Sequence, residues 1–153
     1  MLAAGDLAPD FELPGLDGRA WSLRAALQTG PVLVVFFKIA CETCQFTLPF
    51  LQKFTATDNL RLIAVSQDDA PDTKAFLEHF QLQLPVVLDK AWEYRVSNAY
   101  ETSFVPSLFL IETDGRISLT AEGFRRRELE ELGARFGVPV FGGGQTIPTF
   151  RPG

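Results

Sequence analysis

The stretch VLVVFFKIACETC, residues 32–44, decides the fold prediction for this chain. Its first six residues are apolar without alternation, which is typical of a β-strand buried on both faces. Two thiols, Cys41 and Cys44, follow at the point where a helix is predicted to begin, and they are the only cysteines among the 153 residues. Two thiols at this spacing can close a small disulfide ring. The pattern therefore predicts a dithiol redox centre at a strand-to-helix junction.

The two thiols are expected to play different roles. Cys41 lies at the predicted helix N-cap, where unpaired backbone N–H groups and the helix dipole stabilise an anion. We expect a lowered pKa for Cys41, which would make it the attacking nucleophile. Cys44, one turn later on the same face, should be more buried and able to resolve a mixed disulfide. Glu42 is expected to be a surface acid whose charge opposes the thiolate, or alternatively a weak general base.

A metal site and a purely structural disulfide are the weaker interpretations of the two thiols. A metal site needs about four ligands, and the chain offers two thiols and the single His79, which we expect to face solvent. A disulfide across so short a loop would constrain little chain entropy. We therefore expect no bound metal, unless two chains share an ion.

Composition limits the classes of partner. Apolar residues make up 46% of the chain, including 14 Phe, and the net charge is −5, so we expect one soluble domain with an aromatic core. The only basic cluster is at residues 125–127, which argues against nucleic acid as a partner. Residues 1–10 lack signal-peptide features, and no run approaches the ~18 apolar residues of a membrane span. We expect a cytoplasmic protein with no membrane partner, where a lone Cys-x-x-Cys is more often catalytic or metal-binding than structural.

Alternating periodicities predict an α/β fold with a mixed central β-sheet flanked by helices. An Asp17-Gly18 turn indicates an N-terminal β-hairpin within residues 5–23. Further strands are predicted at residues 32–37, 60–65, 86–88, 107–111 and 117–120. Helices are predicted at residues 43–57, 71–80, 91–99 and 125–136, the first with a kink at Pro49. Phe76, Leu77 and Phe80 are expected to face inward from the second helix, and Leu129, Leu132 and Phe136 from the last. We predict one domain over residues 1–137 and an irregular C-terminal tail over residues 138–153.

The dipeptide Val105-Pro106 is the second landmark. Pro106 directly precedes the apolar strand at residues 107–111, a position where a cis X–Pro bond can start a strand. A cis-proline facing Cys41 would keep metal ions away from the dithiol and leave the backbone of Val105 free to pair with a substrate strand. Without the cysteines, an ordinary trans-proline would be the preferred interpretation.

Taken together, these segments resemble the thioredoxin superfamily, and within it the TlpA/ResA-like and AhpC/TSA (redoxin) branch. The resemblance covers roughly residues 5–136 and is carried by GDLAPDFEL at 5–13 followed by Asp17-Gly18, Phe36-Phe37 with the dithiol and Pro49, LPVVLD at 84–89, and VPSLFLI at 105–111 followed by DGRI at 114–117. It implies a thioredoxin-like fold with an N-terminal β-hairpin and a central βα insertion. It also implies that Cys41 is the nucleophile, Cys44 the resolving thiol and Pro106 the cis-proline, with no cofactor or metal.

Three positions depart from the family pattern. Ala40 precedes Cys41 where many relatives carry Trp, and Glu42-Thr43 lacks the proline common before the second cysteine. Val35 occupies the strand position where thioredoxins place a buried acid that assists deprotonation of the resolving thiol. The redox potential therefore does not follow from the sequence.

The resemblance favours a thiol–disulfide oxidoreductase that acts on a disulfide-bearing protein or small-molecule substrate and is coupled to a thiol reductant system. Val105, Glu42 and Thr43 are the predicted substrate-binding residues. The alternative is a peroxiredoxin-like thiol peroxidase with Cys41 as the peroxidatic cysteine, although Lys38-Ile39-Ala40 replaces the Pro and Thr usual before that residue. A non-enzymatic redox-sensing or metal-binding module is the third possibility, for which the sequence holds no positive sign.

Overall fold

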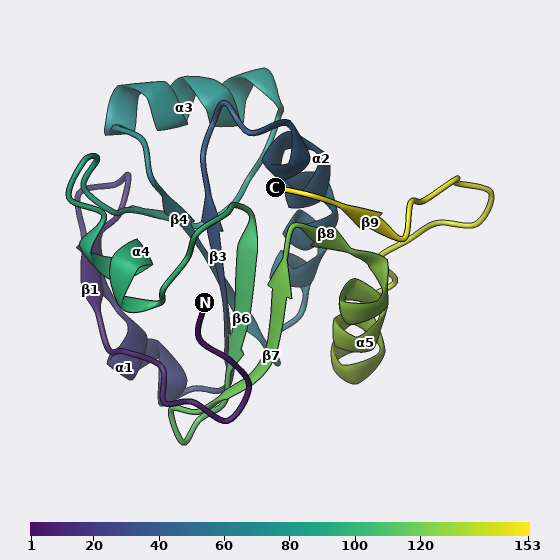
Figure 1. The fold of residues 1–153 in the computed structure, drawn as a ribbon, viewed down its shortest axis with the longest axis horizontal. Coiled ribbons are helices and arrows are strands. Elements are labelled where there is room, and N and C mark those ends of the chain that lie inside the picture. Colours follow the sequence, from purple (N-terminus) through teal and green to yellow (C-terminus); the bar gives the residue numbers. More distant parts are fainter.

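The central sheet has five strands in the order β5-β4-β3-β6-β7, as shown by the computed structural model of residues 1–153 (Figure 1). The strands are β3 (Val32–Phe37), β4 (Arg61–Ser66), β5 (Val86–Leu88), β6 (Ser107–Ile111) and β7 (Ile117–Glu122). Strand β3 is central, pairing parallel with β4 and antiparallel with β6, and β6 pairs antiparallel with β7. The predicted mixed sheet is confirmed.

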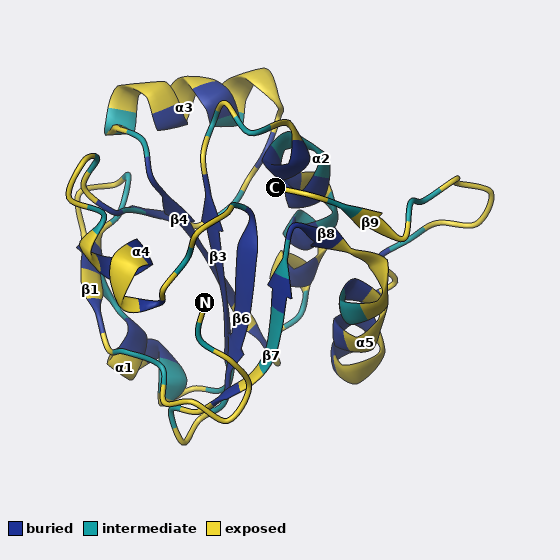
Figure 2. Ribbon diagram, in the orientation of Figure 1, coloured by how far each residue is buried: buried dark blue, intermediate teal, exposed yellow.

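Both faces of β3 are covered, which explains its unbroken apolar sequence. All six of its residues are fully buried. Alternate side chains point to opposite faces of a strand, so Leu33, Val35 and Phe37 join the core under α2 (Glu42–Leu51), α3 (Ala70–His79) and α5 (Arg126–Phe136). Their neighbours join a second core under α1 (Leu23–Leu27), α4 (Arg95–Ala99) and the N-terminal hairpin. Figure 2 shows the sheet strands buried and the outer faces of the helices exposed.

The N-terminal hairpin consists of β1 (Glu12–Pro14) and β2 (Ala20–Ser22), which pair antiparallel as predicted. Gly18 lies in its turn with a φ of 81°, a conformation that favours glycine. Helix α1 was not predicted from the sequence. Ser22 starts it, because its hydroxyl accepts a hydrogen bond from the Ala25 N–H at 3.2 Å and so caps the first turn.

Several helix predictions need correction. Helix α2 ends at Leu51 and continues as a 3₁₀-helix (Gln52–Ala56), soon after Pro49, which has no N–H to donate. Phe80 is exposed rather than inward, because α3 ends at His79 and the Phe80 ring lies beyond it, against the rings of Phe76 and His79. Helix α4 begins only at Arg95, since the preceding Tyr94 has a left-handed φ of 45°.

The predicted irregular tail is partly ordered. Val138 and Val140 are buried against the core next to α5. After a loop, β9 (Phe150–Arg151) pairs antiparallel with β8 (Phe124–Arg125), a pairing that the sequence analysis did not predict. Figure 1 shows this last segment returning to the end of α2 that carries the cysteines.

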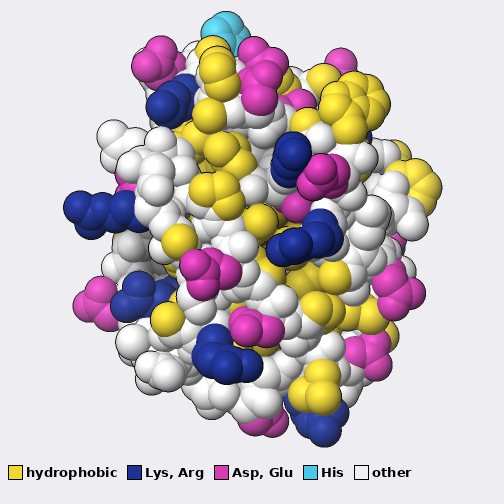
Figure 3. Space-filling view, turned by 90° about the vertical axis from the view of Figure 1, so that its left-hand side faces the viewer, with side chains coloured by type: hydrophobic (Ala, Val, Ile, Leu, Met, Phe, Trp, Pro, Cys, Tyr) yellow, Lys and Arg dark blue, Asp and Glu magenta, His cyan; other side chains and the backbone are white.

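The surface carries no large single-sign patch on the face shown in Figure 3, where acidic and basic side chains alternate. His79 projects from the edge of this face and is exposed, as predicted. None of the helices has the length and apolar character required to span a bilayer.

Candidate active site

Cys41 is the N-cap of α2. Its backbone is extended (φ −85°, ψ 113°), and its Sγ accepts a hydrogen bond from the Cys44 N–H at 3.1 Å. The pKa of Cys41 is lowered from 9.0 to about 6, first by a hydrogen bond from the Cys44 side chain and then by the N–H groups of Cys44 and Thr43. Burial and the charge of Glu42 oppose this lowering. Cys41 is therefore mostly thiolate at neutral pH.

Cys44 differs from Cys41 in its burial and in the direction of its pKa shift. It is fully buried in the core beneath α2, and both cysteines are free. Burial raises the pKa of Cys44 strongly, and its interaction with Cys41 raises it further. One turn of helix thus holds a partly exposed thiol with a lowered pKa and, behind it, a buried thiol with a raised pKa.

The loop before Cys41 is held by an acid that the sequence analysis did not consider. Asp68 follows β4, and its Oδ2 accepts a hydrogen bond from the Ile39 N–H at 2.8 Å. Gln45, on α2, donates its side-chain N–H to the Ile39 carbonyl at 2.9 Å. These two hydrogen bonds to Ile39 fix the conformation of the turn that precedes Cys41. The charge of Asp68 also contributes to raising the pKa of Cys44.

The second landmark lies opposite the thiolate. The Val105–Pro106 peptide bond is cis, as expected, and Pro106 is buried at the start of β6. In its protonated form the Cys41 thiol donates to the Val105 carbonyl at 3.4 Å. The Val105–Pro106 dipeptide, which the sequence singled out, therefore lies within hydrogen-bonding distance of the Cys41 Sγ.

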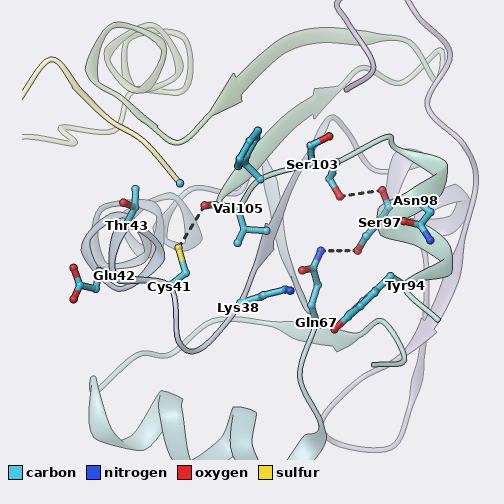
Figure 4. Close-up of a pocket in the computed structure, with 13 residues that line it drawn as sticks. Lys38, Cys41, Glu42, Thr43, Gln67, Tyr94, Ser97, Asn98, Ser103 and Val105 are labelled. Atoms are coloured by element: carbon cyan, nitrogen blue, oxygen red, sulfur yellow. Dashed lines mark hydrogen bonds between the residues drawn. The ribbon is translucent and has the colours of Figure 1, made fainter. Parts of the chain in front are cut away.

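A pocket of about 520 Å³ opens beside Cys41 (Figure 4). The predicted substrate-binding residues Glu42, Thr43 and Val105 all line it, with Glu42 exposed. Thr43 is largely buried, and its hydroxyl is already engaged by the Pro152 carbonyl. The remaining lining residues are Lys38, Gln67, Tyr94, Ser97, Asn98, Thr102, Ser103, Phe104 and Gly153.

A buried polar network builds the far wall of this pocket. The Asp89 carboxylate is buried and accepts hydrogen bonds from the Val96 N–H and from both the N–H and the hydroxyl of Ser97, the last at 2.7 Å. Gln67 in turn donates its side-chain N–H to the Ser97 hydroxyl at 2.9 Å. The network anchors the start of α4 and so holds Tyr94, whose ring lies 5.2 Å from the Lys38 ammonium.

Sequence reasoning missed the network and Lys38, although a signal was present. Lys38, Gln67 and Asp89 each directly follow a strand of the parallel part of the sheet, β3, β4 and β5. The carboxyl ends of such strands meet at one edge, where ligands of open α/β sheets bind. No group of three or more His, Cys, Asp or Glu side chains is arranged so as to hold a metal ion.

Comparison with known proteins places this site in a family. The model of the AhpC/TSA family matches residues 4–120, which include both cysteines and Pro106. The chain belongs to the AhpC/TSA family.

Relatives of this AhpC/TSA chain include redox proteins. It is 28% identical over 131 residues to thiol-disulfide oxidoreductase ResA of Geobacillus thermodenitrificans, covering 83% of this chain and 74% of ResA. It is 27% identical to the methylamine utilization protein MauD of Paracoccus versutus, covering 84% of this chain and 63% of MauD.

Solved structures agree with the fold. The thioredoxin domain of a thiol-disulfide oxidoreductase from Bacteroides vulgatus superposes with a TM-score of 0.76 at 25% identity, covering 89% of this chain and 99% of that domain. Peroxidoxin BcpB of Mycobacterium tuberculosis superposes with a TM-score of 0.72 at 20% identity, covering 88% and 98%, and shares the fold. The predicted thioredoxin-like fold is confirmed, and the chain is a thioredoxin-like redox enzyme of the thiol–disulfide oxidoreductase type.

Proposed function

We propose that this enzyme exchanges electrons with substrate disulfides through a Cys41 mixed disulfide that Cys44 resolves. The observation that carries the proposal is the contrast between the two thiols: a thiolate at the N-terminus of α2 and a buried, protonated thiol one turn behind it. The relative named thiol-disulfide oxidoreductase ResA supports the same reaction class.

In the reducing direction, the Cys41 thiolate attacks one sulfur of the substrate disulfide. A bond forms between Cys41 and that sulfur, the substrate S–S bond breaks, and the leaving thiolate takes a proton from solvent. Cys44 then gives its proton to solvent and attacks the Cys41 Sγ, which releases the second substrate thiolate, and this thiolate is protonated in turn. The substrate gains two electrons and two protons, and the enzyme holds a Cys41–Cys44 disulfide that an external thiol must reduce.

The surroundings of Cys41 favour both steps. The N–H groups of Thr43 and Cys44 stabilise negative charge on Cys41, which makes it a good nucleophile and also a good leaving group when a reducing thiol attacks the oxidised enzyme. The Val105 carbonyl beside Cys41 and the pocket with Glu42 are where a protein or small-molecule disulfide would bind. Only sulfur atoms change oxidation state in this cycle.

A trapping experiment tests the two roles. Cys44→Ser should accumulate a mixed disulfide at Cys41 when a protein disulfide is offered, as seen by mass spectrometry, whereas Cys41→Ser should trap nothing. Full multiple-turnover reduction by Cys44→Ser would show that Cys44 does not resolve.

A parallel turnover assay separates disulfide exchange from peroxidase activity. The reduced enzyme is offered a protein disulfide and hydrogen peroxide in separate reactions with one thiol reductant. We expect disulfide reduction with negligible peroxide consumption. Rapid, Cys41-dependent peroxide consumption would overturn the proposal and assign the dithiol to a thiol peroxidase.

A further inference from the structure

The last four residues of the chain, Phe150–Gly153, cross the active site and are called the strap below. Phe150 and Arg151 pair with β8, and the chain then continues over the N-terminus of α2. There the Thr43 hydroxyl donates a hydrogen bond to the Pro152 carbonyl at 2.5 Å. Figure 4 shows its end beside Val105 and above Cys41. The strap thus contacts two of the three residues that the sequence predicts to bind substrate.

Two glycines mark how closely the strap backbone approaches its neighbours. A Cβ atom on Gly153 would overlap the carbonyl oxygen of Val105, and one on Gly123 would overlap the carbonyl oxygen of Arg151. Gly123 also has a φ of 75°, which favours glycine. The strap is therefore packed backbone to backbone along Val105, the position that an extended substrate peptide would need.

The strap is held by few contacts. Besides the Thr43–Pro152 hydrogen bond, its pairing with β8 comprises two residue pairs. The Arg151 guanidinium lies 4.5 Å from the centre of the Phe46 ring, and the Arg125 guanidinium lies 4.8 Å from the centre of the Phe150 ring. Phe150 and Gly153 are exposed. A pair of such short strands has little stability of its own. No strap residue belongs to either hydrophobic core, so departure of the strap would break only these surface contacts.

The other side of Cys41 stays open. The pocket reaches the thiolate between Lys38, Gln67 and Tyr94 on one wall and Glu42 on the other, with Gly153 forming part of the rim (Figure 4). A small disulfide can enter there while the strap remains in place. An extended polypeptide lying along Val105 would collide with Gly153.

We propose that the strap determines which class of disulfide reacts. Small-molecule disulfides react while the strap is in place, whereas protein disulfides react only in molecules whose strap has moved away from Val105. The inference rests on the proposed thiol–disulfide exchange at Cys41. If the strap is closed in about nine molecules in ten, it lowers the apparent rate for a docking peptide about tenfold, because only the open fraction binds.

The test compares four forms of the protein: wild type, a form lacking residues 150–153, Gly153→Ala and Gly143→Ala. The last is a matched control, since Gly143 lies in the same tail and a Cβ there meets no atom within 4 Å. Each form is assayed with insulin as the protein disulfide and bis(2-hydroxyethyl) disulfide as the small one. A cooperative thermal unfolding transition shows that each form is folded. If the form lacking residues 150–153 does not fold, Gly153→Ala alone is compared with wild type and Gly143→Ala.

Removal of residues 150–153 should raise the ratio of insulin to small-disulfide turnover about tenfold. Gly153→Ala should raise it in the same direction, and Gly143→Ala should leave it unchanged. A ratio within about twofold of wild type in both strap variants would overturn the strap inference. If wild type reduces neither disulfide in a Cys41-dependent manner, the proposed function itself fails, and the inference fails with it.

Discussion

The low pKa of Cys41 depends on the side chain of Cys44, which can be tested with two closely matched substitutions. The hydrogen bond from the Cys44 side chain is the largest cause of the lowering. Cys44→Ala removes that donor and keeps the backbone N–H at 3.1 Å. Cys44→Ser keeps a hydroxyl donor in the same place. Both variants remove the second thiol, so Cys41 is the only group left to alkylate.

The expected rise in the Cys41 pKa follows from the free energy of one hydrogen bond to a charged group. A hydrogen bond to a charged group contributes about 1.5–3 kcal/mol, and about 1.4 kcal/mol corresponds to one pH unit in a titration midpoint. Wild-type Cys41 should titrate with a pKa of about 6. Cys44→Ala should move the midpoint up by about one to two pH units. The thiolate fraction at neutral pH would then fall from about nine-tenths to between about one half and one tenth.

The assay is the rate of iodoacetamide alkylation of the reduced protein as a function of pH, followed by mass spectrometry. Because only the thiolate reacts, the rate should be high above the midpoint and fall as the pH drops through it. We expect Cys44→Ser to keep a midpoint near that of wild type and Cys44→Ala to be shifted upward. Equal midpoints in the two variants would refute the argument, since the backbone N–H groups would then account for the whole lowering.

Three further predictions concern charged groups. Glu42→Gln should lower the alkylation midpoint of Cys41, because the Glu42 charge raises that pKa. Asp89→Ala should destabilise the protein by about 2–3 kcal/mol in urea unfolding, because it leaves buried donors unpaired. Arg135→Met should cost up to about 1 kcal/mol at neutral pH, because it removes the bidentate pair with Glu112. Arg135 holds the pKa of Glu112 below 4.5, so the stabilisation is present above that value and the cost should vanish as the pH falls through the lowered pKa.

Each of these predictions has a control and a result that would contradict it. Glu78→Gln, on the exposed surface of α3, should leave the Cys41 midpoint unchanged, and an equal shift would point to net charge rather than to Glu42. Asp114→Ala, in an exposed turn, should cost much less than Asp89→Ala, and equal losses would contradict the role of the buried network. A cost of Arg135→Met that stays constant with pH would show that Glu112 is not its electrostatic partner.

Much of the fold follows from local sequence pattern. The unbroken apolar run of β3, the Asp17-Gly18 turn and the Cys41 N-cap are each encoded within a few residues, and all three occur in the structure where they are predicted. Errors arose where a pattern was locally ambiguous. Phe80 continues the apolar spacing of α3 but lies beyond its end, and Leu23 continues an apolar strand but begins α1.

The two thiols, their order on the helix and the proline before β6 could be predicted from local sequence, because strand burial, helix capping and thiol spacing are short-range properties. The surroundings of these residues come from long-range packing. Asp89 and Gln67 meet because the ends of parallel strands converge at one edge of the sheet. The strap reaches Thr43 across 109 positions of sequence, through a two-residue strand pairing that no local periodicity encodes. Contacts of this kind depend on how whole layers pack, and so they become visible only in the folded chain.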